Sequence, residues 1–441
     1  MKIYRTLDAP LSVHIETNTS CNQQCRHCYN FWRNDAPNLK ENLSKSLIVR
    51  IAEQLVKHRV FHAIITGGEP LLNAASLILL IDELNKKKIT FSLNSNLALL
   101  TSELAEKLKS VGLSSVLTSL LSYDETTHDY LSSTQGSFRR IMRGIDVARM
   151  ANIKVAVNMV VMKNNLMHVE ETGRFVHKLG AFSFSATRVM TPRSQQYQFP
   201  KELTLTTDDI RLIVRQMLAL KNTKMRLDSL IPYPSCFFDD EIARKMFIGR
   251  ACSAGKTSLA IASDGSIRAC THHEKVYGSL IFDDLSSVWL QMQEWRDGSL
   301  LPEFCRSCRL LPKCGGGCRM ASKGNDICEK DSIMNSEMLP ELSSAMREVH
   351  ISTLKNDTEL FVKRSCRFRK DREIGIINTG GIRNTLVSPE TLTLLEKLYA
   401  ENVVFTPNSL QKEYNIIMNK NRYLFFLKSL ISKNVLAIVT V

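Results

Sequence analysis

The chain has 441 residues, of which 44% are hydrophobic and 23% are charged, and this is the composition of an ordinary globular protein. Its net charge of +14 suits an acidic partner, but the basic residues are scattered and predict mainly a solvated surface. The sequence has no apolar run long enough for a signal peptide or for the roughly 20 residues of a membrane span, so we expect a cytoplasmic protein.

Short apolar strands alternate with amphipathic helices from residue 11 to about residue 220. This alternation indicates βαβ units and a parallel sheet, and therefore an α/β fold. The predicted strands cover residues 11–17, 60–66, 89–95, 114–120, 154–161 and 182–188. Six strand–helix units predict a partial barrel of the TIM type, whose ligands bind at the carboxyl ends of the strands.

The alternation stops after about residue 230, where Pro232 and Pro234 precede a region rich in glycine and cysteine. Residues 252–328 have little regular periodicity, as expected where metal ligation holds the chain together instead of a large apolar core. A third pattern of strands and helices begins near residue 358. We therefore predict three domains, at residues 1–230, 231–345 and 355–441.

Twelve cysteines are too sparse for a disulfide scaffold in a chain of this length, and the cytosol keeps thiols reduced. Ten of the twelve fall into two spaced groups. Grouped cysteines in such a compartment indicate metal binding.

The first group, Cys21, Cys25 and Cys28, follows the first predicted strand with the spacing Cys-x3-Cys-x2-Cys. Three thiolates leave one iron of a 4Fe–4S cubane open to another ligand, whereas a zinc site would add His27. The spacing alone supports both readings equally. The segment Gly67-Gly68-Glu69-Pro70 follows the second strand, where its glycines allow close approach of the backbone to a ligand, and its position favours the cluster.

In motif, order and spacing these residues resemble the radical S-adenosylmethionine (SAM) superfamily. The resemblance implies that the three cysteines hold a 4Fe–4S cluster whose open iron chelates SAM, which is cleaved reductively to a 5'-deoxyadenosyl radical. It also implies further SAM-binding residues, namely Gly67, Gly68 and Glu69 at the methionine amino group, Ser119 at the ribose, His27 near the adenine and, more weakly, Asn158. A buried strand serine without a ligand is the alternative for Ser119.

The sequence also departs from this superfamily after its fourth predicted strand. Leu121 and Ser122 stand where Asp-Gly is common, and an arginine often found about a dozen residues further on is missing. The contact to the SAM carboxylate is therefore unassigned, as is any catalytic acid or base.

The second group contains seven cysteines, with Gly265 between the first two. A zinc ribbon could use four of them, but a radical-forming barrel upstream favours iron. The arrangement resembles the SPASM domain, which carries auxiliary iron–sulfur clusters in radical SAM enzymes that modify peptides. The resemblance assigns Cys252, Cys270 and Cys318 to a first auxiliary cluster, and Cys305, Cys308, Cys314 and Cys328 to a second, which makes three 4Fe–4S clusters in all.

Two cysteines lie outside both groups. Cys236 is either a small apolar residue beside Phe237 and Phe238 or the missing ligand of the first auxiliary cluster. Cys366 has no partner nearby in the sequence and is expected to be structural. His272, two residues after Cys270, is either a donor near the cluster or a surface residue.

The last 80 or so residues predict three strands followed by three helices, in the order of a winged-helix-like domain. The strands cover residues 359–368, 373–379 and 384–388, and the helices begin at Pro389, Pro407 and about Asn419. Winged helices often bind DNA, but the strand-first order is similar to the leader-peptide recognition modules related to the PQQ-biosynthesis peptide chaperone. There an extended peptide adds to a sheet edge, whereas a merely structural cap is the third possibility. Along the exposed edge of the predicted sheet lie the basic residues Lys363, Arg364, Arg367, Arg369 and Lys370.

Taken together, the resemblances imply a maturase that takes a hydrogen from a ribosomally made precursor peptide and installs an intramolecular cross-link. A carbon–carbon cyclophane of the XYE type is favoured over a thioether link. A sulfatase-maturating enzyme is a further alternative, but Thr271 stands where that family has aspartate. A zinc-holding nucleic-acid-binding protein is the non-enzymatic alternative. The expected partners are the precursor peptide, bound through its leader by residues 355–441, and an electron donor such as flavodoxin or ferredoxin.

Overall fold

The computed structural model describes residues 4, 6–35, 40–192, 199–247, 250–322, 326–335, 354–414, 416 and 419–439. The chain forms two compact units, residues 1–340 and 341–441. The predicted boundary between residues 345 and 355 falls largely on residues 336–353, outside the described ranges. Within those ranges, no helix is both long and apolar enough to cross a membrane.

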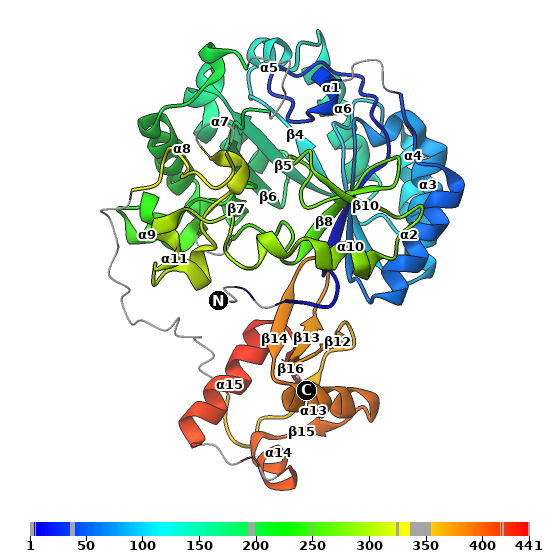
Figure 1. The fold of residues 1–441 in the computed structure, drawn as a ribbon, viewed down its shortest axis with the longest axis vertical. Helices are drawn as coiled ribbons and strands as arrows, with labels where there is room; N and C mark the ends of the chain where they lie inside the picture. The colour runs from blue at the N-terminus through cyan, green and yellow to red at the C-terminus, as the bar shows by residue number, and fades with distance from the viewer. Residues whose placement is uncertain are drawn as a thin grey trace. The chain divides into compact units, whose positions relative to one another are not determined.

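A ten-stranded sheet runs through the first unit, and six of its strands match the predicted ones. These are β1 (Ser12–Glu16), β2 (His62–Thr66), β3 (Thr90–Asn94), β4 (Ser115–Ser119), β5 (Lys154–Val161) and β6 (Ser183–Arg188). Each pairs in parallel with the next, so the carboxyl ends of all six meet at one edge (Figure 1). The expected α/β fold with a partial parallel barrel is confirmed.

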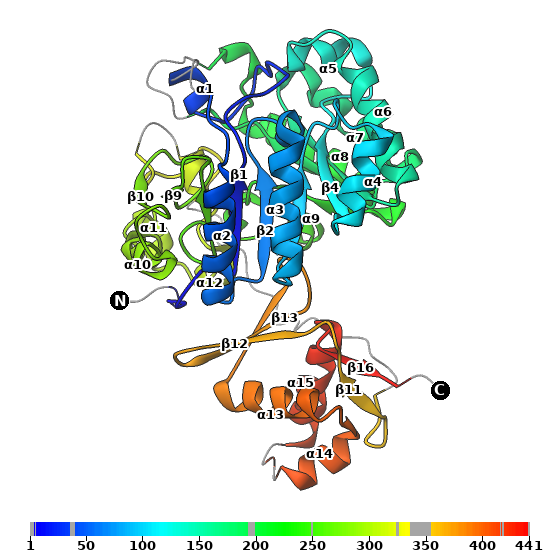
Figure 2. The ribbon, with the colours of Figure 1, turned by 90° about the vertical axis from the view of Figure 1, so that its right-hand side faces the viewer.

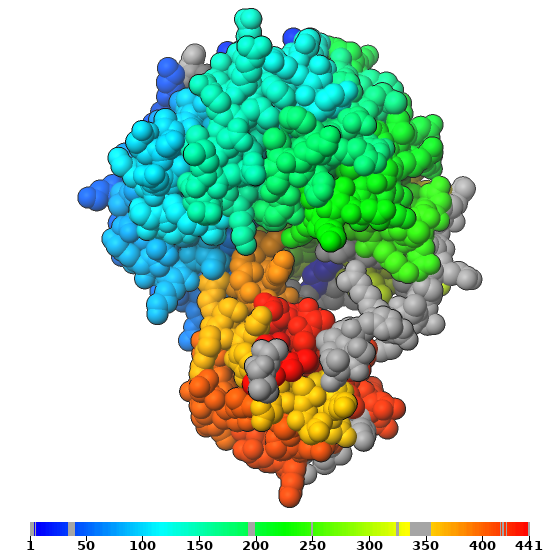
Figure 3. Space-filling view, turned by 180° about the vertical axis from the view of Figure 1, so that it is seen from behind, coloured from blue at the N-terminus to red at the C-terminus, as the bar shows by residue number. Residues whose placement is uncertain are grey.

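Amphipathic helices cover the outer face of this sheet. They are α2 (Lys45–Lys57), α3 (Ala74–Lys86), α4 (Ser102–Ser110), α6 (Ser137–Met150), α7 (Val169–Lys178) and α8 (Thr207–Ala219), with the shorter α1 (Trp32–Asp35) and α5 (Glu125–Ser132) in the loops. The N-cap of α2 is Ser44, whose hydroxyl accepts a hydrogen bond from the backbone of Leu47. Leu47, Ile48 and Ile51 are buried, and each such side chain contributes about 1.5–3 kcal/mol on burial. Seen from behind, the residues coloured cyan to green form a continuous surface (Figure 3).

The sheet continues beyond the predicted strands at both edges. β7 (Arg226–Asp228) pairs in parallel with β6, and β8 (Ser258–Ile261) pairs in parallel with β1. Two antiparallel strands follow, β9 (Ser266–Arg268) and β10 (Val276–Ser279). The first part of the cysteine-rich region is therefore continuous with the barrel sheet, and its separation into a domain of its own stays a prediction. Its helices are α9 (Glu241–Phe247), α10 (Leu285–Gln291), α11 (Glu303–Arg306) and α12 (Leu311–Cys314).

Two buried ion pairs join the carboxyl ends of barrel strands to the cysteine-rich region. Glu16 at the end of β1 pairs with Arg268 at the end of β9, and both side chains are almost completely buried. Arg188 at the end of β6 donates to Asp331 at 2.9 Å, and this pair is also buried. Removing one partner of such a pair leaves a charge without water or a counterion, so both pairs fix the two regions together.

The second unit has its own core and two three-stranded sheets, β12-β13-β14 and β15-β11-β16. The elements in chain order are β11 (Leu360–Val362), β12 (Arg367–Asp371), β13 (Ile374–Asn378), β14 (Asn384–Val387), α13 (Pro389–Ala400), β15 (Val404–Phe405), α14 (Pro407–Glu413), α15 (Lys420–Ser432) and β16 (Leu436–Ile438). A turn splits the first predicted strand into β11 and β12, while the helices begin where expected. Within this unit the three helices gather on one side of the β12–β13 hairpin (Figure 2).

Candidate functional site

The three cysteines of the first group lie on the loop that follows β1 at the carboxyl edge of the sheet. They are close neighbours. Burial, together with the nearby Cys28 and Cys21, raises the pKa of Cys25 to about 12. The Arg33 guanidinium interacts with all three thiols. It donates a hydrogen bond to Cys28 and acts electrostatically on Cys21 and Cys25. Sequence reasoning missed Arg33, which lies beyond the motif and shows no spacing signal of its own.

Gly67 and Gly68 hold the cysteine loop against the end of β2. The Gly68 backbone N–H donates to the Asn18 carbonyl at 2.9 Å. A Cβ on Gly68 would lie 1.9 Å from the Ser20 carbonyl oxygen, and Gly67 has a φ of +144°, which favours glycine. The two glycines are therefore required by the contact between two loops, and their contact with the SAM amino group stays a prediction.

Glu69 is buried, with 1% of its surface exposed. Its carboxylate accepts hydrogen bonds from the Leu71 backbone at 3.0 Å, the Ser95 hydroxyl at 2.7 Å and the Asn96 backbone at 2.8 Å. Burial raises the pKa of Glu69, and these donors oppose that shift. Because most of its acceptor positions are occupied, the side chain ties β2 to the end of β3, and a ligand contact would come more readily from the backbone of this segment.

A row of polar residues crosses β4 to β7, at the last residue of β4 and of β7 and in the interior of β5 and β6. Ser119 pairs in register with Asn158, Asn158 with Ser185, and Ser185 with Asp228. The Asn158 side-chain oxygen accepts a hydrogen bond from Thr187 at 2.6 Å, so this amide has a fixed orientation. The structure thus places Ser119 and Asn158 side by side on neighbouring strands, and their roles toward SAM stay predictions. The alternation of polar and apolar residues in the predicted strands is the signal that could have found Ser185.

His27 lies in the cysteine loop with its ring nitrogen Nδ1 buried and without a hydrogen-bond partner among the described residues. Burial lowers the pKa of His27 to about 4, so the ring is neutral near pH 7. A neutral ring with one unpartnered nitrogen can pack against a flat heterocycle and accept or donate one hydrogen bond. Its predicted position near the adenine of SAM is compatible with this environment and stays a prediction.

The three cysteines assigned to the first auxiliary cluster come from separate segments and meet in the structure. Burial, together with the nearby Cys252 and Cys270, raises the pKa of Cys318 to about 12. Cys270 likewise has Cys252 as a neighbour. Three neighbouring thiols, of which Cys318 is buried and the other two are half-buried, are a donor set that an iron–sulfur cluster can use.

His272 connects this set to the first cysteine loop. Its backbone N–H donates to the Cys270 sulfur at 3.5 Å. Its ring stacks on Tyr29, the residue after Cys28, with the ring centroids 4.0 Å apart. His272 is therefore a donor beside the first auxiliary set and not a surface residue. The aromatic stack joins two segments that are more than 200 residues apart in the sequence.

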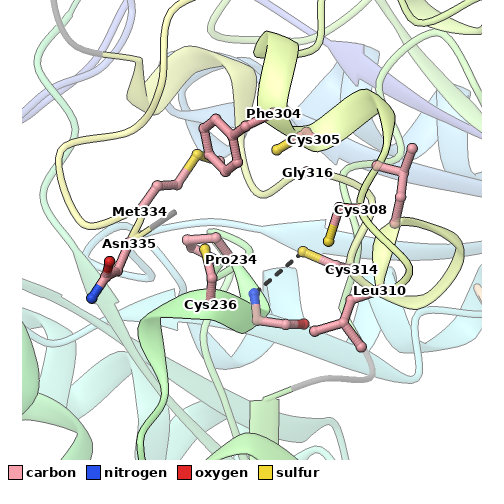
Figure 4. Close-up of a pocket in the computed structure, with 12 residues that line it drawn as sticks. Pro234, Cys236, Phe304, Cys305, Cys308, Leu310, Cys314, Gly316, Met334 and Asn335 are labelled. Carbon is pink, nitrogen blue, oxygen red and sulfur yellow. Dashed lines mark hydrogen bonds between the residues drawn. The ribbon is translucent and has the colours of Figure 1, made fainter. Parts of the chain in front are cut away.

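The cysteines assigned to the second auxiliary cluster do not all lie together. Cys305, Cys308 and Cys314 line one pocket, and the fourth thiol in that pocket is Cys236 (Figure 4). The Cys328 sulfur instead lies 3.6 Å from the Ser299 carbonyl oxygen. The pocket encloses about 380 Å³ of empty space, part of it open to solvent.

The described residues contain no group of three or more His, Cys, Asp or Glu side chains close enough to hold one metal ion. A cubane cluster makes a different demand, because each cysteine binds its own iron at a separate corner. Three neighbourhoods of thiols, one at the end of β1 and two in the cysteine-rich region, fit that demand.

A partial parallel barrel with three thiols at the end of β1 defines a class of enzyme. Residues 15–176 match the family described as the radical SAM superfamily. These residues include the end of β1, the cysteine loop and β2 to β5, so this part of the chain is similar to radical SAM domains.

The relatives with similar sequences differ in their activities. An AdoMet-dependent heme synthase of Methanosarcina barkeri is 28% identical over 40% of this chain and 50% of that protein, so this match spans only half of the relative. A PqqA peptide cyclase of Ruegeria pomeroyi is 24% identical over 71% of this chain and 83% of that protein.

Two solved structures share the fold. Native anSMEcpe with bound AdoMet has a TM-score of 0.60 and 17% identity, over 74% of this chain and 95% of that chain. SuiB of Streptococcus suis has a TM-score of 0.58 and 19% identity, over 74% of this chain and 78% of that chain. At these identities the likeness is one of fold alone.

Proposed function

We propose that this enzyme is a maturase that removes a hydrogen from a ribosomally made precursor peptide and installs an intramolecular cross-link, with a carbon–carbon cyclophane favoured. The observation that carries the proposal is the presence of two further groups of thiols, in the same unit as the radical SAM loop. Relatives add support, because a PqqA peptide cyclase matches over 71% of this chain and SuiB has been solved with its precursor peptide SuiA.

The residues fit three 4Fe–4S clusters and one SAM. Cys21, Cys25 and Cys28 would hold the cluster that binds SAM, and when bound, this pair supplies the 5'-deoxyadenosyl radical that takes the hydrogen. The protein would hold the cluster loop against the end of β2 through Gly67 and Gly68, and would place the Arg33 guanidinium beside the three thiols. An electron donor such as flavodoxin or ferredoxin would reduce the cluster. The cytoplasmic location stays a prediction.

The second unit is proposed to bind the leader of the precursor. Its strand β12 lies at an edge of a three-stranded sheet, and such an edge can accept an added peptide strand. The basic residues on this segment are less available than the sequence indicated. Arg369 is buried in an ion pair with Asp371 at 2.7 Å, and Arg367 donates to Asn378 at 2.6 Å. Lys370 alone of these three residues is exposed. Because the two arginines are engaged within the unit, backbone pairing supports the proposal more than charge does.

The proposal is tested with the peptides encoded by short reading frames beside the gene. The reconstituted enzyme is incubated without oxygen with SAM, dithionite and each peptide, and the products are examined by mass spectrometry. We expect 5'-deoxyadenosine together with a peptide that has lost two hydrogens, and fragmentation distinguishes a carbon–carbon link from a thioether. A chain with Cys21, Cys25 and Cys28 all replaced by Ala is the control. Formation of 5'-deoxyadenosine with every peptide unchanged would contradict a peptide cross-linking function.

A further inference from the structure

The pocket beside α11 and α12 contains four thiols, and one of them comes from a distant segment. Cys305, Cys308 and Cys314 belong to the run that follows Pro302. Cys236 belongs to a short 3-10 turn, Ser235–Phe237, between β7 and α9. In the close-up the Cys236 and Cys314 side chains lie on the side of the pocket opposite Phe304 (Figure 4).

Two observations tie the turn of Cys236 to the other thiols. The backbone N–H of Ser235 donates to the Cys314 sulfur at 3.2 Å, which is the kind of bond that commonly stabilises a cysteine bound to a cluster. Cys236 also packs against the apolar cluster of Leu301, Cys305, Leu311 and Met334. The turn and the cysteine run are therefore joined by a polar and an apolar contact.

The neighbouring aromatic residues hold the turn in place. Phe237 and Phe238 are both buried, and both pack on Tyr233 with ring centroids 5.7 Å away. Phe238 also stacks on Phe247 of α9. These rings form their own core, whereas the thiol of Cys236, the residue before Phe237, lies in the pocket with the other cysteines. The interpretation of Cys236 as a small apolar partner of Phe237 and Phe238 therefore does not explain its position.

Cys328 has different surroundings. Its backbone N–H donates to Asp326 at 2.8 Å, and its sulfur faces the Ser299 carbonyl. The charges that act most on it are those of Asp326, Arg319 and Arg306. Its neighbours thus offer a carboxylate and a carbonyl, and it does not line the pocket that holds the other three thiols.

We propose that Cys236, in place of Cys328, is the fourth protein ligand of the second auxiliary cluster, together with Cys305, Cys308 and Cys314. This inference rests on the proposed iron–sulfur function. On ligation, each thiol loses its proton to solvent and its sulfur forms one bond to one iron, so no oxidant or reductant is needed. The first auxiliary set then keeps Cys252, Cys270 and Cys318 as its described thiols, and Cys236 does not complete it.

Substitutions of the two competing cysteines test the proposal in the full chain. Cys236→Ala and Cys328→Ala are each made where Cys21, Cys25 and Cys28 are already Ala, so that only auxiliary clusters remain. The parent should hold about eight iron and eight sulfide, four of each per cluster. We expect Cys236→Ala to lose up to about half of the iron or to change the electron paramagnetic resonance spectrum of one cluster, while Cys328→Ala matches the parent. Cys366→Ala, in the core of the second unit, controls for loss of a buried thiol.

Alkylation of the unsubstituted holoprotein makes the test independent of whether a variant folds. Iodoacetamide should modify Cys328 but spare Cys236, and removal of the clusters with chelator and oxidant should make both reactive. Protection of Cys328 with modification of Cys236 would overturn the proposal, as would equal effects of the two substitutions or an effect of Cys328→Ala alone. Zinc without iron in the unsubstituted chain would instead contradict the proposed function as a whole.

Discussion

The two cysteine regions of the first unit are built in opposite ways. The first set lies within eight residues on one loop, and the end of β2 fixes that loop through backbone hydrogen bonds such as Glu69 N–H to the Ser20 carbonyl at 2.7 Å. The second group spans segments that meet only when β8 to β10 join the sheet and the chain returns through α11 and α12. A local set can be recognised from its spacing. A set gathered from distant segments depends on packing that the spacing does not reveal.

The largest effect should come from removing the local set. Replacing Cys21, Cys25 and Cys28 together with Ala should abolish SAM cleavage, because no other thiols described in the structure lie on this loop. The auxiliary thiols lie on other segments, so about eight of twelve iron should remain, at four per cluster. Iron analysis and chromatography of 5'-deoxyadenosine measure both quantities. Loss of all iron would show that the two regions are not built independently.

The contact between the two regions is tested by Arg268→Met, which leaves Glu16 buried without its partner. We expect a loss of about 3–5 kcal/mol in the free energy of unfolding, measured by urea denaturation of the cluster-free protein. Arg174→Met is the control, because its pair with Glu170 is exposed and should contribute about 0–1 kcal/mol. Equal effects of the two substitutions would mean that the buried pair does not join the regions.

The fixed loop of the first set is tested by Gly68→Ala. The added methyl group would lie 1.9 Å from the Ser20 carbonyl oxygen, so the cysteine loop must move. We expect a loss of stability of about 1–3 kcal/mol and lower iron occupancy at the first site, with the auxiliary iron unchanged. At Gly381 a Cβ would meet nothing within 4 Å, so Gly381→Ala should leave all iron in place. Full iron in Gly68→Ala would show that the loop tolerates displacement.

The smallest effect on the cysteine regions should come from removing the second unit, which has its own apolar core. A chain that ends near residue 350 should keep its iron and still form 5'-deoxyadenosine with dithionite. Its kcat/KM for the full precursor should fall about tenfold, equivalent to about 1.4 kcal/mol of binding energy from the leader. If the shortened chain keeps its fold by circular dichroism and modifies the precursor at the intact rate, the leader-binding proposal is wrong.

Much of the barrel could be predicted because its signals are local. All six predicted strands are present, since each is a run of apolar residues long enough to stand out between helices. β7 and β8 were missed because they have three and four residues, and the polar segments around them hide any period. The positive charge available along β12 was overestimated for a related reason, because nothing in the sequence shows that Arg369 forms an ion pair with Asp371.

The same distinction between local signals and contacts made only on folding applies to the candidate site. The first cysteine set and the trio Cys252, Cys270 and Cys318, which the motifs group together, are neighbours in the structure, and their role as cluster ligands stays a prediction. The position of Cys236 could not be predicted, because about 70 residues separate it from the thiols that it joins. The stack of Tyr29 on His272 is another contact that only the folded sheet creates.

The proposed function depends most on iron at the end of β1, and one measurement tests for it directly. The unsubstituted protein is reconstituted without oxygen, its iron, sulfide and zinc are determined, and the same sample is given SAM and dithionite. We predict about twelve iron and twelve sulfide per chain, four of each per cluster, and steady formation of 5'-deoxyadenosine. Stoichiometric zinc with no visible charge-transfer absorption and no 5'-deoxyadenosine would contradict the account.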